Sequence, residues 1–395
     1  MEKLPRDIYL DILSRLPITS LVQIKGVCKA WRALAEDTRL PSMFHTRAKR
    51  RNPSLILHCD TPIINKLYYV GTGEEPDLYG NKVSEIDARI KSVMPEFEVV
   101  GSCNGLLCIS DTLFFDPIRI CNPFTGDYIE LPKTNHQPGQ EVAVGFGYHP
   151  DTMKYKMVRM AYYHKTHANL QVRGWSEHWD VQILTIGTNA WRSLGECPWK
   201  LDPRPSEALL NAALHWVTFR YLYPPGPGLR IISFDLAEEK FKMIAGPSCG
   251  SLQTCNFHLV GLSGCLSAAV CLDGGGSDIW VMKVYKVSNS WTKDYVIGAY
   301  VPVSLKPHVR PRSRIWYKSR LSRGAVQVLC ILKNGEFLMQ YENGGFVLYN
   351  PQEEEFKELG ISGLPKWFAT TIHVDSLFSV ETVLKMNYQG AKLTS

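Results

Sequence analysis

Several features of secreted and membrane proteins are absent from this 395-residue sequence. No N-terminal apolar stretch resembles a signal peptide, and the longest mostly apolar run, residues 259–272, is interrupted by Gly and Ser and is too short to cross a bilayer. The 11 cysteines include no C-x-x-C pair, and their odd number disfavours a disulfide framework. These absences predict a protein of the cytoplasm, the nucleus or both, without membrane contact.

The spacings of common catalytic and metal sites are also missing. There is no H-E-x-x-H motif, and the glycines at 274–276 are not followed by the Lys-Ser/Thr pair of a phosphate-binding loop. His164 and His167, with His178 further on, lack another ligand at a fixed spacing, and their segment has the composition of a polar loop. We therefore predict no catalytic residues, no metal site and no cofactor.

Charge is distributed unevenly along the chain, whose formal net charge is +6. Residues 1–51 hold 11 Lys and Arg against 5 Asp and Glu, so the totals of 44 and 38 leave 33 of each sign in the remainder. The N-terminal segment is therefore expected to favour an acidic partner. A solvated basic tail at Arg47, Lys49, Arg50 and Arg51 is the alternative explanation.

The first 45 residues have the apolar spacing of three short helices. Apolar side chains recur at intervals of three and four residues, with Ile8, Ile12, Leu13 and Leu16 on one face of a helix that Pro17 ends and the third helix ending before Pro41. They are Ile8, Ile12, Leu13, Leu16, Leu21, Ile24, Cys28, Trp31, Leu34 and Ala35. A unit this small buries little surface by itself, so we expect its helices to complete their burial against a partner.

The motifs of this segment, in this order, resemble an F-box. They are Leu4-Pro5-x-Asp7-Ile8, then residues 12–17 (Ile-Leu-Ser-Arg-Leu-Pro), then Val27-Cys28-Lys29-x-Trp31-Arg32. The resemblance implies binding to a Skp1-like adaptor, an acidic protein that links the F-box to a cullin–RING scaffold. It implies an adaptor-docking face formed by Leu4, Pro5, Ile8, Leu16, Val27, Cys28 and Trp31. Periodicity alone allows another interpretation, in which these residues are only the internal core of a three-helix bundle.

The remainder of the chain repeats one pattern of short strands, in which a hairpin ends with an aromatic residue. The clearest copies cover residues 113–132, 180–195, 231–246, 279–297 and 346–360. Their equivalent aromatics are Tyr128, Trp191, Phe241, Trp291 and Phe356. The intervals of 63, 50, 50 and 65 residues approach the roughly 50-residue kelch blade. We expect the aromatics to fill the gaps between blades, and the segments 104–109, 211–219 and 334–341 to form innermost strands.

A propeller must avoid an open sheet edge, commonly by pairing both chain ends in one blade. The segments Ser54–Cys59 and Thr370–Val380 are suited to that role. The predicted fold is therefore α+β and multidomain, with a three-helix F-box at 1–45, a basic linker at 46–53, an all-β propeller of about six blades at 54–384, and a C-terminal tail at 385–395. A seventh blade would require an additional blade within residues 145–180.

Four phrases of this region resemble the F-box-associated domain of plant F-box proteins. They cover residues 101–108, 122–126, 145–148 and 279–283. The resemblance implies a non-catalytic substrate-recognition subunit of an SCF-type (Skp1–cullin–F-box) ubiquitin ligase, whose propeller binds a target protein. Two alternatives stay open: a propeller enzyme or lectin-like protein tethered by its helices, and an F-box protein that acts outside a ligase.

One charged segment indicates where a target would bind. Residues 305–323 contain seven Lys and Arg and no acidic residue, and Arg310, Arg312 and Arg314 lie beside Trp316 and Tyr317. Arg pairs with carboxylates or phosphates in a bidentate manner and stacks on aromatics, so an acidic or phosphorylated target protein is predicted here. The alternative is an exposed connection between blades. Nucleic acid is not expected, because the rest of the domain has no net positive charge.

Overall fold

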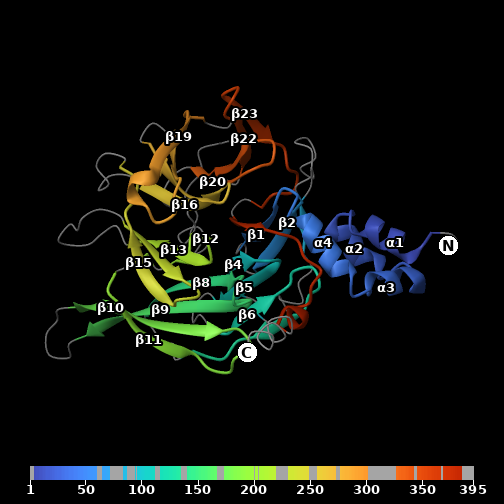
Figure 1. Cartoon of the computed structure of the whole chain (residues 1–395), viewed down its shortest axis with the longest axis horizontal. Coiled ribbons are helices and arrows are strands. Elements are labelled where there is room, and N and C mark those ends of the chain that lie inside the picture. Colours follow the sequence, from blue (N-terminus) through green and yellow to red (C-terminus); the bar gives the residue numbers. More distant parts are fainter. Residues whose placement is uncertain are drawn as a thin grey trace.

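The computed structural model describes most of the chain, in segments. They are residues 4–59, 65–71, 83–86, 94, 96–111, 116–134, 140–166, 173–199, 201–202, 204–218, 230–248, 256–272, 276–300, 326–341, 345–365 and 368–384. A small helical unit lies at one side of a much larger domain made of strands (Figure 1).

The helical unit contains four helices where the sequence predicted three. They are α1 (Arg6–Leu13), α2 (Ile18–Ile24), α3 (Lys29–Ala35) and α4 (Leu40–Ala48). Pro41, which we took as a stop signal, lies in the first turn of α4, where a missing N–H costs nothing. Leu40, Phe44 and Ala48 follow at four-residue spacing and are all buried. The predicted basic linker at 46–53 therefore begins within the last turn of a helix.

The described strands form six sheets of four strands, arranged as the blades of a propeller (Figure 1). Every sheet pairs neighbouring strands in antiparallel order. The strands are β1 (Ser54–Cys59), β2 (Lys66–Val70) and β3 (Ser84–Glu85) in blade 1, β4 (Phe97–Cys103), β5 (Leu106–Asp111), β6 (Ile118–Cys121) and β7 (Tyr128–Glu130) in blade 2, and β8 (Glu141–His149), β9 (Lys154–Thr166), β10 (Arg173–Thr185) and β11 (Arg192–Cys197) in blade 3.

The same order continues through the second half of the domain. Blade 4 contains β12 (Ala208–Leu210), β13 (Ala213–Val217), β14 (Ile231–Asp235) and β15 (Lys240–Ile244); blade 5 contains β16 (Asn256–Leu262), β17 (Cys265–Cys271), β18 (Ser277–Met282) and β19 (Trp291–Ile297); blade 6 contains β20 (Val326–Ile331), β21 (Phe337–Tyr341), β22 (Phe346–Asn350) and β23 (Glu355–Leu359). The last strand, β24 (Ala369–His373), returns to blade 1.

The six-blade prediction and the pairing of the chain ends are both confirmed. Strand β24 pairs with β1 from Ser54 opposite His373 to His58 opposite Ala369, and it is the innermost strand of blade 1. Residues 145–180 form no additional blade, because they belong to the long strands β8, β9 and β10 of blade 3. The first and last strands of the propeller thus lie side by side in one sheet.

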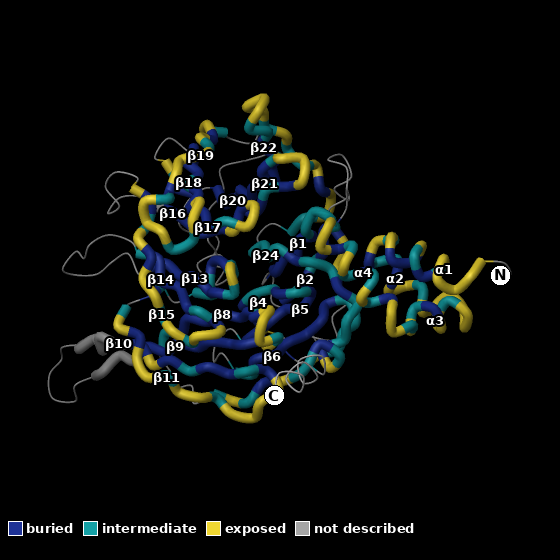
Figure 2. The backbone as a smooth tube through the Cα atoms, viewed as in Figure 1, coloured by how far each residue is buried: buried dark blue, intermediate teal, exposed yellow. Residues whose placement is uncertain are grey.

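Apolar side chains are buried mainly between neighbouring blades, and the tube in Figure 2 is dark blue along most inner strands. Each of six buried clusters joins two consecutive blades. In the cluster between blades 1 and 2, Ile56 and Leu67 meet Leu107 and Ile109. The domain is therefore held together by contacts between sheets as well as by the pairing within each sheet.

Four of the five predicted inter-blade aromatics occupy such positions. The indole N–H of Trp191 donates to Pro132 O of the preceding blade at 2.7 Å, and that of Trp291 donates to Ala245 O at 2.8 Å. Phe241 packs in the cluster between blades 3 and 4, and Phe356 in the one between blades 5 and 6. The prediction was wrong for Tyr128, which is 40% exposed and lies under the guanidinium of Arg119.

This difference predicts unequal costs of truncation at equivalent positions. Trp291→Ala should lower the free energy of unfolding by about 3–5 kcal/mol, because it leaves a cavity and an unpaired carbonyl. Tyr128→Ala should cost only about 0.5–1 kcal/mol, the size of an exposed cation–π contact. Denaturant titration of both variants measures the difference. Equal losses would contradict the assigned packing.

Candidate functional site

Apolar side chains lie exposed on the surface of the helical unit. Leu4, Ile8 and Ile12 follow at four-residue spacing and are 51%, 45% and 43% exposed, while Val22 and Val27 are 39% and 66% exposed. A different set of side chains is buried within the unit, made of Leu10, Leu13, Ile18, Leu21, Leu34, Leu40 and Phe44. The exposed set therefore does not supply the internal packing of the helices.

The structure corrects the face that we predicted for α1. Ile8, Ile12, Leu13 and Leu16 were placed on one face, but Leu13 is buried with Leu10 whereas Ile8 and Ile12 are exposed. A helix with apolar residues nearly all round offers two possible stripes, and tertiary packing selects one of them.

The residues predicted to dock an adaptor divide into two groups. Leu4, Pro5, Ile8, Val27 and Cys28 are exposed, whereas Leu16 and Trp31 are half-buried. The indole of Trp31 packs edge-on against Tyr9, with ring centroids 6.2 Å apart. The prediction omitted Ile12 and Val22. The four-residue spacing of Leu4, Ile8 and Ile12 is the sequence signal that could have revealed Ile12.

Ion pairs fix the start of α1, which carries this apolar surface. Asp37, in the turn between α3 and α4, accepts from Arg6 Nε at 2.8 Å and from Arg39 Nε at 3.1 Å. Hydrogen bonds from Arg39, followed by the one from Arg6, hold the pKa of Asp37 well below its usual value. Arg39 also contacts Asp7 at 2.7 Å. The carboxylate of Asp37 therefore ties α1 to the loop that precedes α4.

The basic residues near the end of α4 are only partly free in solvent. Arg47 is half-buried and forms an ion pair with Asp11, which also contacts Arg15 at 2.8 Å. Lys49 and Arg50 are exposed. The solvated-tail interpretation therefore holds for part of this segment, while Arg47 joins α4 to α1.

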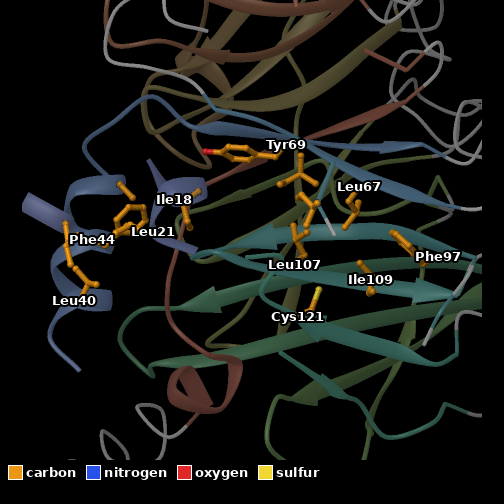
Figure 3. Close-up of a cluster of buried hydrophobic side chains, with 14 of the residues drawn as sticks. Ile18, Leu21, Leu40, Phe44, Leu67, Tyr69, Phe97, Leu107, Ile109 and Cys121 are labelled. Carbon is orange, nitrogen blue, oxygen red and sulfur yellow. The ribbon is translucent and has the colours of Figure 1, made fainter. Parts of the chain in front are cut away.

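The helical unit shares a core with the propeller. Figure 3 shows the ring of Tyr69 in β2 reaching toward Ile18 of α2, with Leu107 further into the propeller; all three belong to one buried cluster. The ring of His45 in α4 lies edge-on to Phe378, with centroids 5.7 Å apart. Asn52 Oδ1 accepts from the backbone N–H of Lys333 at 2.9 Å. These contacts fix the helices against blades 1, 2 and 6.

Residues 374–384, which we call the C-terminal strap, run from β24 between the helices and blade 2. Asn122 Nδ2 donates to Ser376 O at 2.9 Å and to Phe378 O at 2.8 Å. A Cβ on Gly105, whose φ is +84°, would lie 2.0 Å from Cβ of Ser376. Residues 101–108 and 122–126, two of the segments that carry the family resemblance, therefore also hold the strap.

A buried carboxylate connects the strap to blade 1. Asp375 accepts from Tyr69 Oη at 2.8 Å and from Ser54 Oγ at 3.1 Å. Burial raises the pKa of Asp375 to about 6, and it also raises the pKa of Tyr69. The strap thus contacts blade 1, blade 2 and α4 through polar groups removed from water.

The identical order of strands in all blades divides the propeller into two faces. The chain enters β1 and leaves β24 on the face that contacts the helices, which also carries the turns between first and second strands. Connections from one blade to the next leave the opposite face, which we call the connection face. Ile297 and Val326, the strand ends that flank the predicted target segment, lie there. Arg310, Arg312, Arg314, Trp316 and Tyr317 lie outside the described residues, so their role stays a prediction.

Few features of the described residues suggest a metal site or a catalytic site. Within the described segments, no group of three His, Cys, Asp or Glu could hold a metal ion, and the side chains of His164, His167 and His178 lie outside them. Gly246-Pro247-Ser248-Cys249-Gly250 has the letters of a nucleophile elbow. It follows β15, the outer strand of an antiparallel blade, whereas that elbow joins a strand to a helix. No helix in the described part is long and apolar enough to cross a membrane.

Comparison with known proteins identifies the family. Residues 65–384 match the model of the F-box associated beta propeller domain, and residues 1–41 match the F-box-like model. The chain belongs to the F-box proteins that carry this propeller. It is 42% identical to the F-box protein At3g07870 of Arabidopsis thaliana, over 98% of this chain and 94% of that protein. The F-box/kelch-repeat protein At3g23880 and the F-box protein CPR1, from the same plant, are 28% and 26% identical over 87% and 95% of this chain.

Similarity to solved structures is distant. An oligogalacturonate lyase in complex with manganese aligns over 78% of this F-box protein and 76% of the lyase, with a TM-score of 0.41 and 7% identity. A likeness this weak transfers no activity. The family assignment rests on the two sequence models and the plant relatives.

Proposed function

We propose that this F-box protein is the substrate receptor of an SCF-type ubiquitin ligase, acting in the cytoplasm or nucleus without catalytic residues of its own. Its helices dock a Skp1-like adaptor, and through it a cullin–RING scaffold, while its propeller binds the protein to be ubiquitinated. The observation that carries the proposal is the exposed apolar surface of the helices, formed by Leu4, Ile8, Ile12, Val22 and Val27.

Two properties of this surface favour a protein partner over solvent. All five lie within residues 4–27 of one small unit whose packing is supplied by other side chains, and exposed apolar side chains concentrated in this way mark interaction sites. The excess of basic over acidic residues in 1–51 supports an acidic partner. Adaptor binding would cover these side chains, as expected for an interface core.

The charge substitution Val27→Asp should weaken adaptor binding by about 3 kcal/mol or more, because a buried interface cannot solvate an unpaired carboxylate. The melting temperature of the free protein should stay unchanged, since Val27 is 66% exposed. Calorimetric titration with a Skp1-like protein measures the affinity.

Val296→Asp is the matched control. Val296 is 61% exposed and lies in β19, on the outer edge of blade 5, away from the helices. This variant should bind the adaptor as the wild type does. Equal affinity of the Val27→Asp variant and the wild type would refute the proposed docking face.

An F-box protein that acts outside a ligase would bind the adaptor but would not support ubiquitin transfer. Ubiquitin transfer reconstituted with the adaptor, cullin, RING protein and E2 should modify a protein captured by the propeller. Adaptor binding without cullin-dependent transfer would favour the second interpretation.

A further inference from the structure

The six innermost strands surround a central cavity of about 470 Å³. Its walls come from β4, β8, β12, β16, β20 and β24 and from the residues just before β12. The cavity is within the range of small-molecule sites, roughly 300–1,000 Å³. Apolar side chains such as Val99, Phe146, Val260 and Leu329 line it together with polar ones.

The charged groups of the lining are already compensated. Arg204 forms an ion pair with Asp202 at 2.8 Å, and Glu207 Oε2 accepts from the backbone N–H of Leu259 at 2.7 Å. The other lining side chains of the described residues carry no formal charge. The one cation of the lining is thus already paired, so an anionic ligand would lose its hydration without gaining a free counter-charge, which disfavours it.

Uncharged hydrogen-bonding groups in the lining have no protein partner. The side-chain amide of Gln327 forms no hydrogen bond among the described residues and is not sealed from solvent, so it is open to a molecule in the cavity. Thr370 Oγ1 is buried without a partner in the described part of the chain. Unpaired buried polar groups cost stability and are rare unless another molecule pairs with them. Both residues line the cavity, one from β20 and one from β24.

We propose that the propeller cavity binds an uncharged small molecule with an apolar face and several hydroxyl or carbonyl groups, which pair with Gln327 and Thr370. Ligand binding in the cavity requires no adaptor, so this proposal and the proposed ligase role can be refuted separately.

Two probes of equal shape test the ligand class on the full-length chain. Phenyl β-D-glucoside has an apolar ring and uncharged hydroxyls, while phenyl β-D-glucuronide replaces one CH₂OH group by a carboxylate. Calorimetry and ligand-observed NMR should show saturable binding of the glucoside, with the glucuronide at least about tenfold weaker. Absence of saturable glucoside binding, or equal binding of both probes, overturns the proposal.

Matched variants test the assigned residues. Gln327→Leu keeps the side-chain size and removes an unpaired amide, so the melting temperature of the free protein should not fall while glucoside affinity drops about tenfold. Thr370→Val makes the same test from the inner strand of the neighbouring blade. Gln352→Leu, at an exposed turn position, is the control and should bind as the wild type does. Wild-type affinity in both cavity variants contradicts the site.

Discussion

Ending the chain after Phe368 should abolish the cooperative unfolding transition of the propeller. The truncation removes β24, exposes the inner edge of β1, and takes Val380 and Val383 out of the core between blades 2 and 3. At about 1.5–3 kcal/mol for each buried apolar side chain, the loss is on the order of 10 kcal/mol, comparable with the whole stability of a domain. Thermal unfolding followed by circular dichroism measures it.

A truncation after Leu384 is the control and should melt as the full-length protein does, because β24 and the strap remain. If the shorter truncation kept the full-length melting temperature, closure through the last strand would be refuted.

A substitution at Asn122 tests the contribution of the strap to stability separately from that of β24. Asn122 and Asn350 both open an Asn-Pro turn and accept backbone N–H groups through Oδ1, but only Asn122 also donates to the strap, at Ser376 and Phe378. Asn122→Ala should therefore cost about 2–3 kcal/mol more than Asn350→Ala, since it leaves two buried carbonyls unpaired.

Acidification from pH 7 to pH 5 should destabilise the protein steeply. Burial lowers the pKa of His58 and His373 to about 3 and that of His215 to about 4. Exposed histidine titrates near pH 6.5, so below that pH the unfolded chain takes up protons that the native protein cannot bind. The free energy of unfolding is therefore highest above pH 6.5. Below that pH it falls by about 1.4 kcal/mol per pH unit for each proton that the chain takes up on unfolding.

Asp375 acts in the opposite direction. Its pKa of about 6 lies above the value of an exposed carboxyl, so between pH 6 and pH 4 the native protein holds a proton that the unfolded chain releases. Three histidines against one carboxyl leave a net uptake of about two protons on unfolding. Denaturant titrations at several pH values yield this number as the slope of unfolding free energy against pH.

Two substitutions separate the contributions. His373→Gln should flatten the slope by about one proton, and Asp375→Asn should steepen it by about one proton below pH 6. A free energy of unfolding that stays constant from pH 7 to pH 5 would show that these groups do not control acid stability.

The blade count could be predicted from the sequence because the outer hairpins repeat a visible signal. Trp191, Trp291 and their equivalents recur at intervals that only a repeated sheet explains. The inner strands were assigned wrongly. Segments 104–109, 211–219 and 334–341 were expected innermost, but they contain the second strands β5, β13 and β21. The innermost strands mix apolar and polar residues where they line the cavity, as β4 and β24 do, so they lack the continuous apolar run of a second strand such as β13.

The order of the motifs indicated an F-box, but periodicity could not show which apolar side chains of α1 are exposed. Periodicity assigned Ile12 and Leu13 to the same face of the helix. The two residues follow Ile8 by four and five positions, and a helix this short does not show which of them continues the apolar stripe. Packing of Leu10 and Leu13 against the other helices turned Ile12 outward. The strap was missed for a different reason: its partners Asn122 and Gly105 lie more than 250 residues away in sequence, and no local pattern reports such contacts.

The pairing of β24 with β1 also has a consequence for synthesis on the ribosome. The helices, with their exposed apolar residues, are translated before the propeller, whereas the first blade lacks its inner strand until residues 369–373 have been made. A ribosome that stops before these residues therefore releases a chain with complete helices and an open edge on β1, which can pair with a strand of another chain.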